Sequence, residues 1–305
     1  MQLRTVAILS PGEMGSATGN VLTMGGLRVV TCLEGRSRKT REQAAAAGIE
    51  DLPDLETLVR ESDLILSIVA PAHARDLATA VAAAIERAGA RPLFVDCNAI
   101  SPTTVTEIAR IVETAGARFA DAGIIGNPPK PGPQSTRYYV SGEHAPEVAS
   151  LNANGLDVRV VGEKVGQASA LKMCYAALTK GLTALATELH VAAERTGMDE
   201  HLRTELELSQ PELLRWIRRM VPTMPPKAWR WVGEMEEIAD TFESLGLTPR
   251  MLEGAADIYR LAEQASATGT LEEVVGRLAA EVRPPGRGEP ASSGPDSARA
   301  RSGAG

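Results

Sequence analysis

Lys172 is the one charged residue in an otherwise largely apolar stretch with helical periodicity, residues 168–178. A lysine that only faces solvent normally has polar neighbours, so we expect Lys172 to face a cleft. When a carbonyl carbon accepts a hydride, a nearby ammonium group can protonate the developing alkoxide, especially where desolvation lowers the lysine pKa. Lys172 is therefore a candidate general acid and base, and the alternative is a lysine that forms a salt bridge between domains.

The helix around Lys172 has a polar and an apolar face. At roughly 100° per residue, Tyr175, Thr179 and Thr183 share the face of Lys172. Lys180 lies about 80° further around the helix and is a candidate supporting group. The apolar stripe consists of Leu171, Leu178, Leu182, Leu185 and Leu189. We expect the leucines to pack and the polar face to line a site, although Tyr175 also suits a core position.

A second chemical signal lies near the start of the chain, where the apolar run Thr5–Leu9 leads into Ser10-Pro-Gly-Glu-Met-Gly15. In the dinucleotide-binding pattern G-x-G-x-x-G, the second glycine lets the pyrophosphate approach the backbone and the third lets helix and strand pack. Gly12 and Gly15 keep these two positions, and Ser10 replaces the first glycine. The pattern predicts a pyrophosphate on the amides of a helix beginning near Glu13, and the alternative is a tight turn without a ligand.

The choice of cofactor depends on residues 34–40, at the end of the second predicted strand. Arg36 and Ser37 suit the extra phosphate of NADP, because a guanidinium fork and a hydroxyl both bind phosphomonoesters. Glu34 argues for NAD, because an acid at this position binds the ribose hydroxyl. We expect NADP and keep NAD open.

The elements that must position these residues fall into two regions. Short β-rich runs alternate with helical stretches up to about residue 125, which predicts a parallel sheet covered on both faces. From Gly166 onwards the periodicity is helical. The expected fold class is α/β, an N-terminal Rossmann-like parallel sheet followed by an all-α C-terminal domain. The expected domains are residues 1–162, residues 163–282 and a disordered tail, residues 283–305, which is rich in Pro, Gly, Ser and Arg.

Composition excludes several classes of function. The 305 residues are 44% hydrophobic with a net charge of −7, and no basic cluster alternates with aromatic residues, so nucleic acid is not an expected partner. The apolar runs are shorter than a membrane span, and no leader precedes the first strand, so we expect a cytoplasmic protein. The histidine spacing predicts no metal site. We expect all three cysteines, Cys32, Cys97 and Cys174, to be buried.

The order of these motifs resembles the β-hydroxyacid dehydrogenase family, the relatives of 6-phosphogluconate and 3-hydroxyisobutyrate dehydrogenases. The likeness covers about residues 4–195 and rests on Gly12-Glu-Met-Gly15, Arg36-Ser37, Ser67–Pro71 and Asp96–Pro102, followed by Asp121–Pro129 and Gly162–Tyr175. The opening Ser-Pro-Gly-x-Met-Gly is similar to one branch of that family, which has its own C-terminal helical part. The departures from the family pattern are Asn98 for a serine, a missing serine before the paired glycines, and Tyr175 for an asparagine.

The resemblance implies NADP-dependent hydride transfer involving a small hydroxy or keto acid or a related carbonyl compound, a reaction at CH–OH, with Lys172 as the catalytic residue. The implied cofactor-binding residues are Ser10, Gly12, Glu13, Met14, Gly15, Arg36, Ser37, Val69 and Ala70. The implied substrate-binding residues are Asn98, Ser101, Gly126 and Tyr175. The loop of Asn98 and Ser101 suits a substrate carboxylate and equally a helix cap. Reduction of an imine and binding of a dinucleotide without turnover stay open as alternatives.

One segment of the helical region, Trp229–Glu237, combines aromatic and charged residues. Trp231, Met235 and Ile238 belong to an apolar stripe at helical spacing, and Arg230 and Glu234 lie on a neighbouring face. The simpler interpretation is a packed helix with a solvated acidic side. The alternative is that this face closes the active site, where its acids would suit a basic or imine substrate. The resemblance also implies a homodimer through the C-terminal helices.

Overall fold

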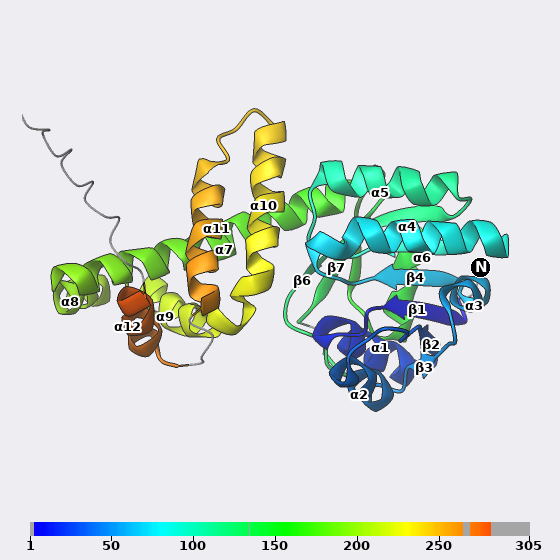
Figure 1. Cartoon of the computed structure of the whole chain (residues 1–305), viewed down its shortest axis with the longest axis horizontal. Coiled ribbons are helices and arrows are strands. Elements are labelled where there is room, and N and C mark those ends of the chain that lie inside the picture. Colours follow the sequence, from blue (N-terminus) through cyan, green and yellow to red (C-terminus); the bar gives the residue numbers. More distant parts are fainter. Residues whose placement is uncertain (1–2, 134, 265–268, 282–305) are drawn as a thin grey trace, which may run out of the picture.

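The structure is a computed structural model that describes residues 3–133, 135–264 and 269–281. Figure 1 shows a sheet with its covering helices in one half of the molecule and a group of helices in the other half. One long helix, α7 (Gln167–Thr196), runs from the sheet into the helical half. Among these residues, no helix is both long enough and apolar enough to cross a membrane.

The described residues form an eight-stranded sheet with the order β3-β2-β1-β4-β5-β6-β7-β8. All neighbouring strands are parallel except β6 and β7. The strands are β1 (Thr5–Leu9), β2 (Arg28–Thr31), β3 (Glu50–Asp51), β4 (Leu64–Ser67), β5 (Leu93–Asp96), β6 (Arg118–Ile125), β7 (Arg137–Ser141) and β8 (Val158–Gly162). This order, with a helical C-terminal region, confirms the predicted fold class.

Three of the helices around the sheet begin at a side chain that caps their first turn. Ser37, Asp54 and Ser101 each accept a hydrogen bond from a backbone amide three residues later, which satisfies an otherwise free donor of the first turn. The helices of this half are α1 (Glu13–Met24), α2 (Arg38–Ala46), α3 (Leu55–Glu61), α4 (Pro71–Ala88), α5 (Pro102–Thr114) and α6 (Ala145–Ala149), followed by the 3-10 turn η1 (Ser150–Asn154).

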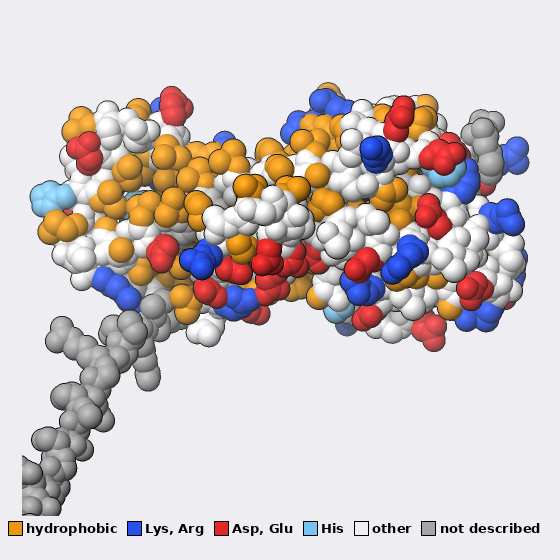
Figure 2. All heavy atoms as spheres, turned by 90° about the horizontal axis from the view of Figure 1, so that it is seen from above, with side chains coloured by type: hydrophobic (Ala, Val, Ile, Leu, Met, Phe, Trp, Pro, Cys, Tyr) orange, Lys and Arg blue, Asp and Glu red, His pale blue; other side chains and the backbone are white. Residues whose placement is uncertain are grey.

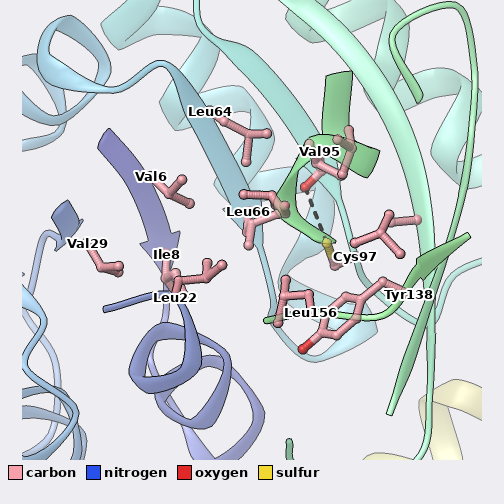
Figure 3. Close-up of a cluster of buried hydrophobic side chains, with 14 of the residues drawn as sticks. Val6, Ile8, Leu22, Val29, Leu64, Leu66, Val95, Cys97, Tyr138 and Leu156 are labelled. Atoms are coloured by element: carbon pink, nitrogen blue, oxygen red, sulfur yellow. Dashed lines mark hydrogen bonds between the residues drawn. The ribbon is translucent and has the colours of Figure 1, made fainter. Parts of the chain in front are cut away.

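The core of the sheet half is formed by apolar side chains from neighbouring strands. Figure 3 shows Ile8 and Leu66 among these strand residues, with Leu22 from α1 and Tyr138 from β7 beside them. The hydroxyl of Tyr138 is 2.7 Å from the hydroxyl of Thr18 in α1, so this buried polar group has a partner. The central strands β1, β4 and β5 are buried on both faces, as expected for parallel strands covered by helices.

The C-terminal half packs around a separate core. Trp231 and Tyr259 meet edge to face there, with their ring centroids 5.2 Å apart, and Met235 and Ile238 are fully buried. After α7 the elements are α8 (Asp199–Ser209), α9 (Pro211–Met220), the 3-10 turns η2 (Val221–Thr223) and η3 (Pro225–Lys227), α10 (Ala228–Ser244), α11 (Arg250–Gln264) and α12 (Leu271–Glu281). The expected tail, residues 283–305, lies outside the described residues.

The leucine stripe of α7 does not pack within the chain as expected. Leu178 is 67% exposed and Leu185 is 56% exposed. The helix packs instead through small residues such as Ala176 and Ala184, which let neighbouring elements approach closely. Figure 2 shows a broad hydrophobic area over the helical half. The expectation of buried cysteines is correct for Cys32 and Cys97 and wrong for Cys174, which also lies exposed on α7.

Candidate active site

The predicted cofactor residues follow neighbouring parallel strands, so the fold gathers them at one edge of the sheet. Ser10 follows β1, Arg36 follows β2 and Val69 follows β4, and these strands are adjacent in the order β2-β1-β4. Loops at the carboxyl ends of the strands are where open α/β sheets bind their ligands. The fold therefore brings these candidate residues to one edge of the sheet.

The turn between β1 and α1 has the backbone shape that the fingerprint requires. Ser10 has a φ of 64°, a left-handed conformation that is uncommon for residues other than glycine. A Cβ atom on Gly15 would lie 2.9 Å from the carbonyl oxygen of Ser10, so the third glycine permits close packing of helix and strand. Ser10 thus adopts the backbone conformation that glycine usually adopts at the first position of the pattern. Residues with such strained backbone angles often lie at functional sites.

The N-terminus of α1 suits the pyrophosphate of a dinucleotide. Gly12 is the N-cap residue, and no side chain among the described residues caps the helix there. A Cβ on Gly12 would still be 4.0 Å from the nearest atom, the carbonyl oxygen of Ser10, so the approach to the backbone is open. Free amides and the positive end of the helix dipole attract phosphate oxygens. The residues present therefore fit the group that the fingerprint predicts.

The loop after β2 carries the residues that bear on the choice between NADP and NAD. Ser37 caps α2 with its hydroxyl oxygen, which is 2.9 Å from the hydroxyl of Thr40. Arg36 is half-buried and Glu34 is exposed. Glu34 also borders a surface hollow between the ends of β2 and β3, together with Arg41. The structure thus places the basic and the acidic signal in the same loop.

The side chain of Asn98 forms hydrogen bonds with the ends of two neighbouring strands, β4 and β5. Its side-chain oxygen accepts a hydrogen bond from the backbone amide of Val69, at 2.6 Å, and its side-chain nitrogen donates to Ser67 and Asp96. The amide group is buried, and all of these bonds stay within the sheet half. Burial raises the pKa of Asp96 to about 7, although its hydrogen bonds with Asn98 oppose the change. Asn98 therefore positions the loop of Val69, a role that the sequence did not predict.

Asp121, at the position of β6 beside Asp96, anchors the start of α7. Its carboxylate accepts hydrogen bonds from the amide of Gly166 at 2.9 Å, from the amide of Ser169 at 3.0 Å, and from the hydroxyls of Ser169 and Ser141. Burial raises the pKa of this carboxyl group, and these hydrogen bonds oppose the increase. An acid held at a helix N-terminus is stabilising. Asp121 thus fixes the helix that carries Lys172.

Lys172 lies one turn further along α7, against the end of β6. Its Nζ donates a hydrogen bond to the carbonyl oxygen of Ile124. A Cβ on Gly123 would lie 2.9 Å from the Cβ of Lys172, so this glycine allows α7 to pack directly on the strand. Burial, and secondarily the positive charge of Arg230, lower the pKa of Lys172 to about 8. A lysine with this pKa exchanges its proton near neutral pH.

Helix α10 reaches from the helical half to the same edge of the sheet. Glu237 accepts hydrogen bonds from the amide of Ser101 and the hydroxyl of Thr104, both at 2.8 Å. Glu234 forms an ion pair with Lys180 of α7, and the Nζ of Lys180 is 5.5 Å from the centre of the Trp231 ring. Glu234 and Glu237, which the sequence placed on a face that closes the site in one interpretation, therefore already have partners within the chain.

Comparisons with known proteins agree with this architecture. The family model described as "NAD binding domain of 6-phosphogluconate dehydrogenase" matches residues 5–146, and "Domain of unknown function (DUF1932)" matches residues 193–262. An uncharacterized 28.5 kDa protein of Methanothermus fervidus is 32% identical over 181 residues, which are 59% of this chain and 68% of that protein. The chain belongs to the β-hydroxyacid dehydrogenase family.

Two solved structures are similar to this chain over most of its length. A conserved hypothetical protein from Sinorhizobium meliloti 1021 is 27% identical with a TM-score of 0.67, over 92% of this chain and 97% of that one. A conserved protein of unknown function, with structural similarity to 3-hydroxyacid dehydrogenases, is 29% identical with a TM-score of 0.62, over 87% of this chain and 100% of that one. Structures of 3-hydroxyisobutyrate dehydrogenases and imine reductases at 16–21% identity share the fold.

The remaining candidate residues of this chain differ in how deeply they are buried. Gly126 is exposed just beyond β6, two residues after the carbonyl that Lys172 contacts, and has a φ of 132°. Tyr175 is 46% exposed on α7. Ser101 caps α5 with its hydroxyl, and its amide donates to Glu237. Sequence reasoning did not name Asp121 as a site residue, although it belongs to a motif. Arg230 entered only through the alternative interpretation of the Trp229–Glu237 segment.

Proposed function

We propose that this protein transfers a hydride between NADP(H) and a small hydroxy or keto acid, a reaction at CH–OH in which Lys172 is the general acid for reduction and the general base for oxidation. The observation that carries this proposal is the lysine itself. Its Nζ, with a pKa lowered to about 8, lies at the end of β6, at the edge of the sheet where the dinucleotide turn also lies. A proton donor beside a nicotinamide site is the minimal equipment for carbonyl reduction.

Bound NADPH would supply the hydride to the carbonyl carbon, and NADP⁺ would take it back in the oxidation. The Nζ of Lys172 gives its proton to the carbonyl oxygen as that oxygen gains negative charge, and the resulting neutral amine regains a proton from solvent. Reduction therefore consumes one proton. The carbonyl of Ile124 orients the ammonium group, and Asp121 holds the helix that carries it. Both contacts fix the proton donor before the reaction, which lowers the cost of aligning it.

The cofactor site in this proposal consists of the residues at the three strand ends. Ser10, Gly12, Glu13, Met14 and Gly15 form the turn that receives the pyrophosphate, and Val69 and Ala70 form the loop near the nicotinamide. Arg36 and Ser37 support NADP rather than NAD, because both offer donors to a phosphate and Glu34 is exposed to solvent.

The substrate site is proposed to lie between the sheet half, residues 1–162, and the helical half, residues 163–282. Gly126 and Tyr175 supply its walls beside Lys172. Asn98 and Ser101 are proposed to position neighbouring segments and not to contact the substrate directly. The side chain of Asn98 holds the backbone of Val69, and the hydroxyl of Ser101 caps α5.

A homodimer through the C-terminal helices is proposed on the exposed apolar face of α7. Leu171, Tyr175, Leu178 and Leu185 are each at least 39% exposed and recur along one helix. Contiguous apolar surface of this kind usually marks an interaction site. Tyr175 belongs both to this face and to the neighbourhood of Lys172, so a second copy would approach the substrate site.

Reduction of an imine is the second candidate. Tyr175 replaces the asparagine that the family pattern places after the lysine, and imine reductases share the fold at 16–19% identity. The third possibility, binding without turnover, is separated from both by the same experiment.

The test is a panel of substrates with NADPH and NADH as reductants. The panel contains aldehydes and ketones that carry a carboxylate, the corresponding methyl esters, and cyclic imines, and absorbance at 340 nm reports turnover. The proposal expects oxidation of NADPH with at least one carboxylate-bearing carbonyl compound. Turnover of cyclic imines alone would replace it with the second candidate. Tight NADPH binding without turnover of any compound would contradict both enzymatic proposals.

A further inference from the structure

The N-terminal part of α10 brings a second cation to Lys172. A Cβ on Gly233 would lie 4.0 Å from the Cβ of Pro71, the first residue of α4, so α10 lies directly against the loop that follows β4. Arg230 stands one turn before Gly233, and its positive charge lowers the pKa of Lys172. Two half-buried cations therefore lie near each other at the edge of the sheet where the cofactor turn is found.

Three acidic residues of α10 are engaged with groups other than these two cations. Glu234 is paired with Lys180, Glu236 is paired with Arg260, and Glu237 accepts its hydrogen bonds from α5. This argues against the alternative interpretation, in which the acids of this helix favour a basic substrate. With these three acids occupied, the N-terminal part of the helix contributes the positive charge of Arg230 to the site.

Arg230 lacks a partner where one is expected. Its Nε is buried and has no hydrogen-bond partner among the residues that the structure describes. Within the same part of the chain, Lys172 donates to a neutral carbonyl and forms no ion pair. A buried guanidinium nitrogen without an acceptor costs free energy, and an anion in the functional complex would supply that acceptor.

We propose that Arg230 binds the carboxylate of the substrate whose carbonyl oxygen Lys172 protonates. The proposal rests on the proposed function and names the group that the substrate must carry. The charges then balance, because the guanidinium meets the carboxylate and the ammonium meets the developing alkoxide. Arginine suits this task, since its planar fork can donate two parallel hydrogen bonds to a carboxylate.

Among the described residues, the loop of Asn98 and Ser101, where the sequence suggested a site for the substrate carboxylate, has no comparable donor without an acceptor. The side-chain amide of Asn98 is already bonded to Val69, Ser67 and Asp96. The backbone amide of Ser101 already donates to Glu237. A substrate carboxylate at that loop would displace a carboxylate of the protein, whereas at Arg230 it finds a donor without an acceptor.

The direct test is binding of a carboxylate probe in the absence of turnover. Protein saturated with NADP⁺ is titrated with butyrate, with the neutral analogue butyramide and with inorganic phosphate in an isothermal calorimeter. Butyrate is expected to bind at least about tenfold more tightly than butyramide, since a hydrogen bond between two charged groups is stronger than one to a neutral group. Tighter Arg230-dependent binding of phosphate than of butyrate would overturn the carboxylate assignment in favour of a phosphorylated substrate.

The matched variants are Arg230→Gln and Arg219→Gln, the second removing an exposed arginine of α9. Arg230→Gln is expected to weaken butyrate binding about 10- to 100-fold and to leave the affinity for NADP⁺ unchanged, and Arg219→Gln is expected to change neither. Arg230→Lys retains the charge without the fork and is expected to be intermediate. If Arg230→Gln does not fold, Arg230→Lys and the comparison of butyrate with butyramide on the wild-type protein decide the matter.

The outcomes separate this inference from the proposed function. Equal butyrate binding by the wild-type protein and Arg230→Gln would overturn the inference even if the protein reduces carbonyl compounds. Failure of the whole substrate panel, together with Arg230-dependent butyrate binding, would overturn hydride transfer and leave the carboxylate site in place. If both hold, Arg230→Gln is expected to raise the KM for acids and not for their methyl esters.

Discussion

Replacing Gly123 by alanine tests how closely the catalytic helix must pack on the sheet. The added Cβ would lie 2.9 Å from both the Cβ of Lys172 and the carbonyl oxygen of Ala168, about 0.5 Å inside the range of ordinary contact. Since one of these atoms is backbone, α7 itself must shift. Overpacking of this kind typically costs 1–3 kcal/mol, and alanine recovers about 0.5–1 kcal/mol of chain entropy. We expect a net loss of about 1–2 kcal/mol of stability.

The matched control is Gly254→Ala in α11, where an added Cβ meets nothing within 4 Å. This change is expected to stabilise the protein by about 0.5–1 kcal/mol, since alanine favours an exposed helix. Scanning calorimetry should therefore show a lower Tm for Gly123→Ala, by about 2–6 °C, and a raised Tm for Gly254→Ala. Turnover should fall about tenfold or more in Gly123→Ala alone, because the proton donor moves. Equal Tm and turnover in the two variants would refute the packing argument.

Three further predictions concern the cofactor, the proton and the subunit interface. Arg36→Ala should weaken NADPH binding about 10- to 100-fold and NADH binding less than about twofold, measured by fluorescence titration, and an equal loss for both would contradict the assignment. Lys172 has a pKa of about 8 and must be protonated for reduction and neutral for oxidation. We therefore expect kcat for reduction to fall about tenfold per pH unit above pH 8, and kcat for oxidation to fall below pH 8. A kcat that does not change across pH 8 in either direction would argue against Lys172 as the proton donor. Leu178→Asp should convert a dimer into monomers, as measured by light scattering. Met24→Asp, at an equally exposed methionine of α1, should leave the dimer intact. If Leu178→Asp is still a dimer, the interface lies elsewhere.

The sequence predicts most of the fold because its signals are local. A cap such as Ser101-Pro102 and an apolar run such as Leu64–Ser67 need only a few adjacent residues, and the structure has elements at both places. β3 was not predicted, because Glu50–Asp51 is two residues long and its identity as a strand depends on pairing with β2. The antiparallel pairing of β6 and β7 was not predicted either, because it joins strands with no helix between them and depends on long-range contacts.

The candidate site is only partly accessible to such reasoning. An isolated charge in an apolar helix pointed to Lys172, but the contact that orients its ammonium group comes from a strand 48 residues earlier. The hydrogen bonds that occupy Ser101 come from Glu237, 136 residues later, so the sequence could not show that this loop is already used. The leucine stripe was misassigned because periodicity marks an apolar face without saying whether the chain or a second molecule covers it.

The central claim, that Lys172 is the proton donor of a hydride-transfer reaction, is tested most directly by Lys172→Met beside Lys164→Met, an exposed lysine just before the same helix. Both proteins are assayed with NADPH and the best carbonyl substrate of the panel, and their NADPH affinities are measured separately. Lys172→Met is expected to lose at least about 100-fold in kcat with unchanged NADPH affinity, and Lys164→Met is expected to match the wild-type protein. A Lys172→Met variant that keeps more than about a tenth of wild-type turnover would contradict the central claim.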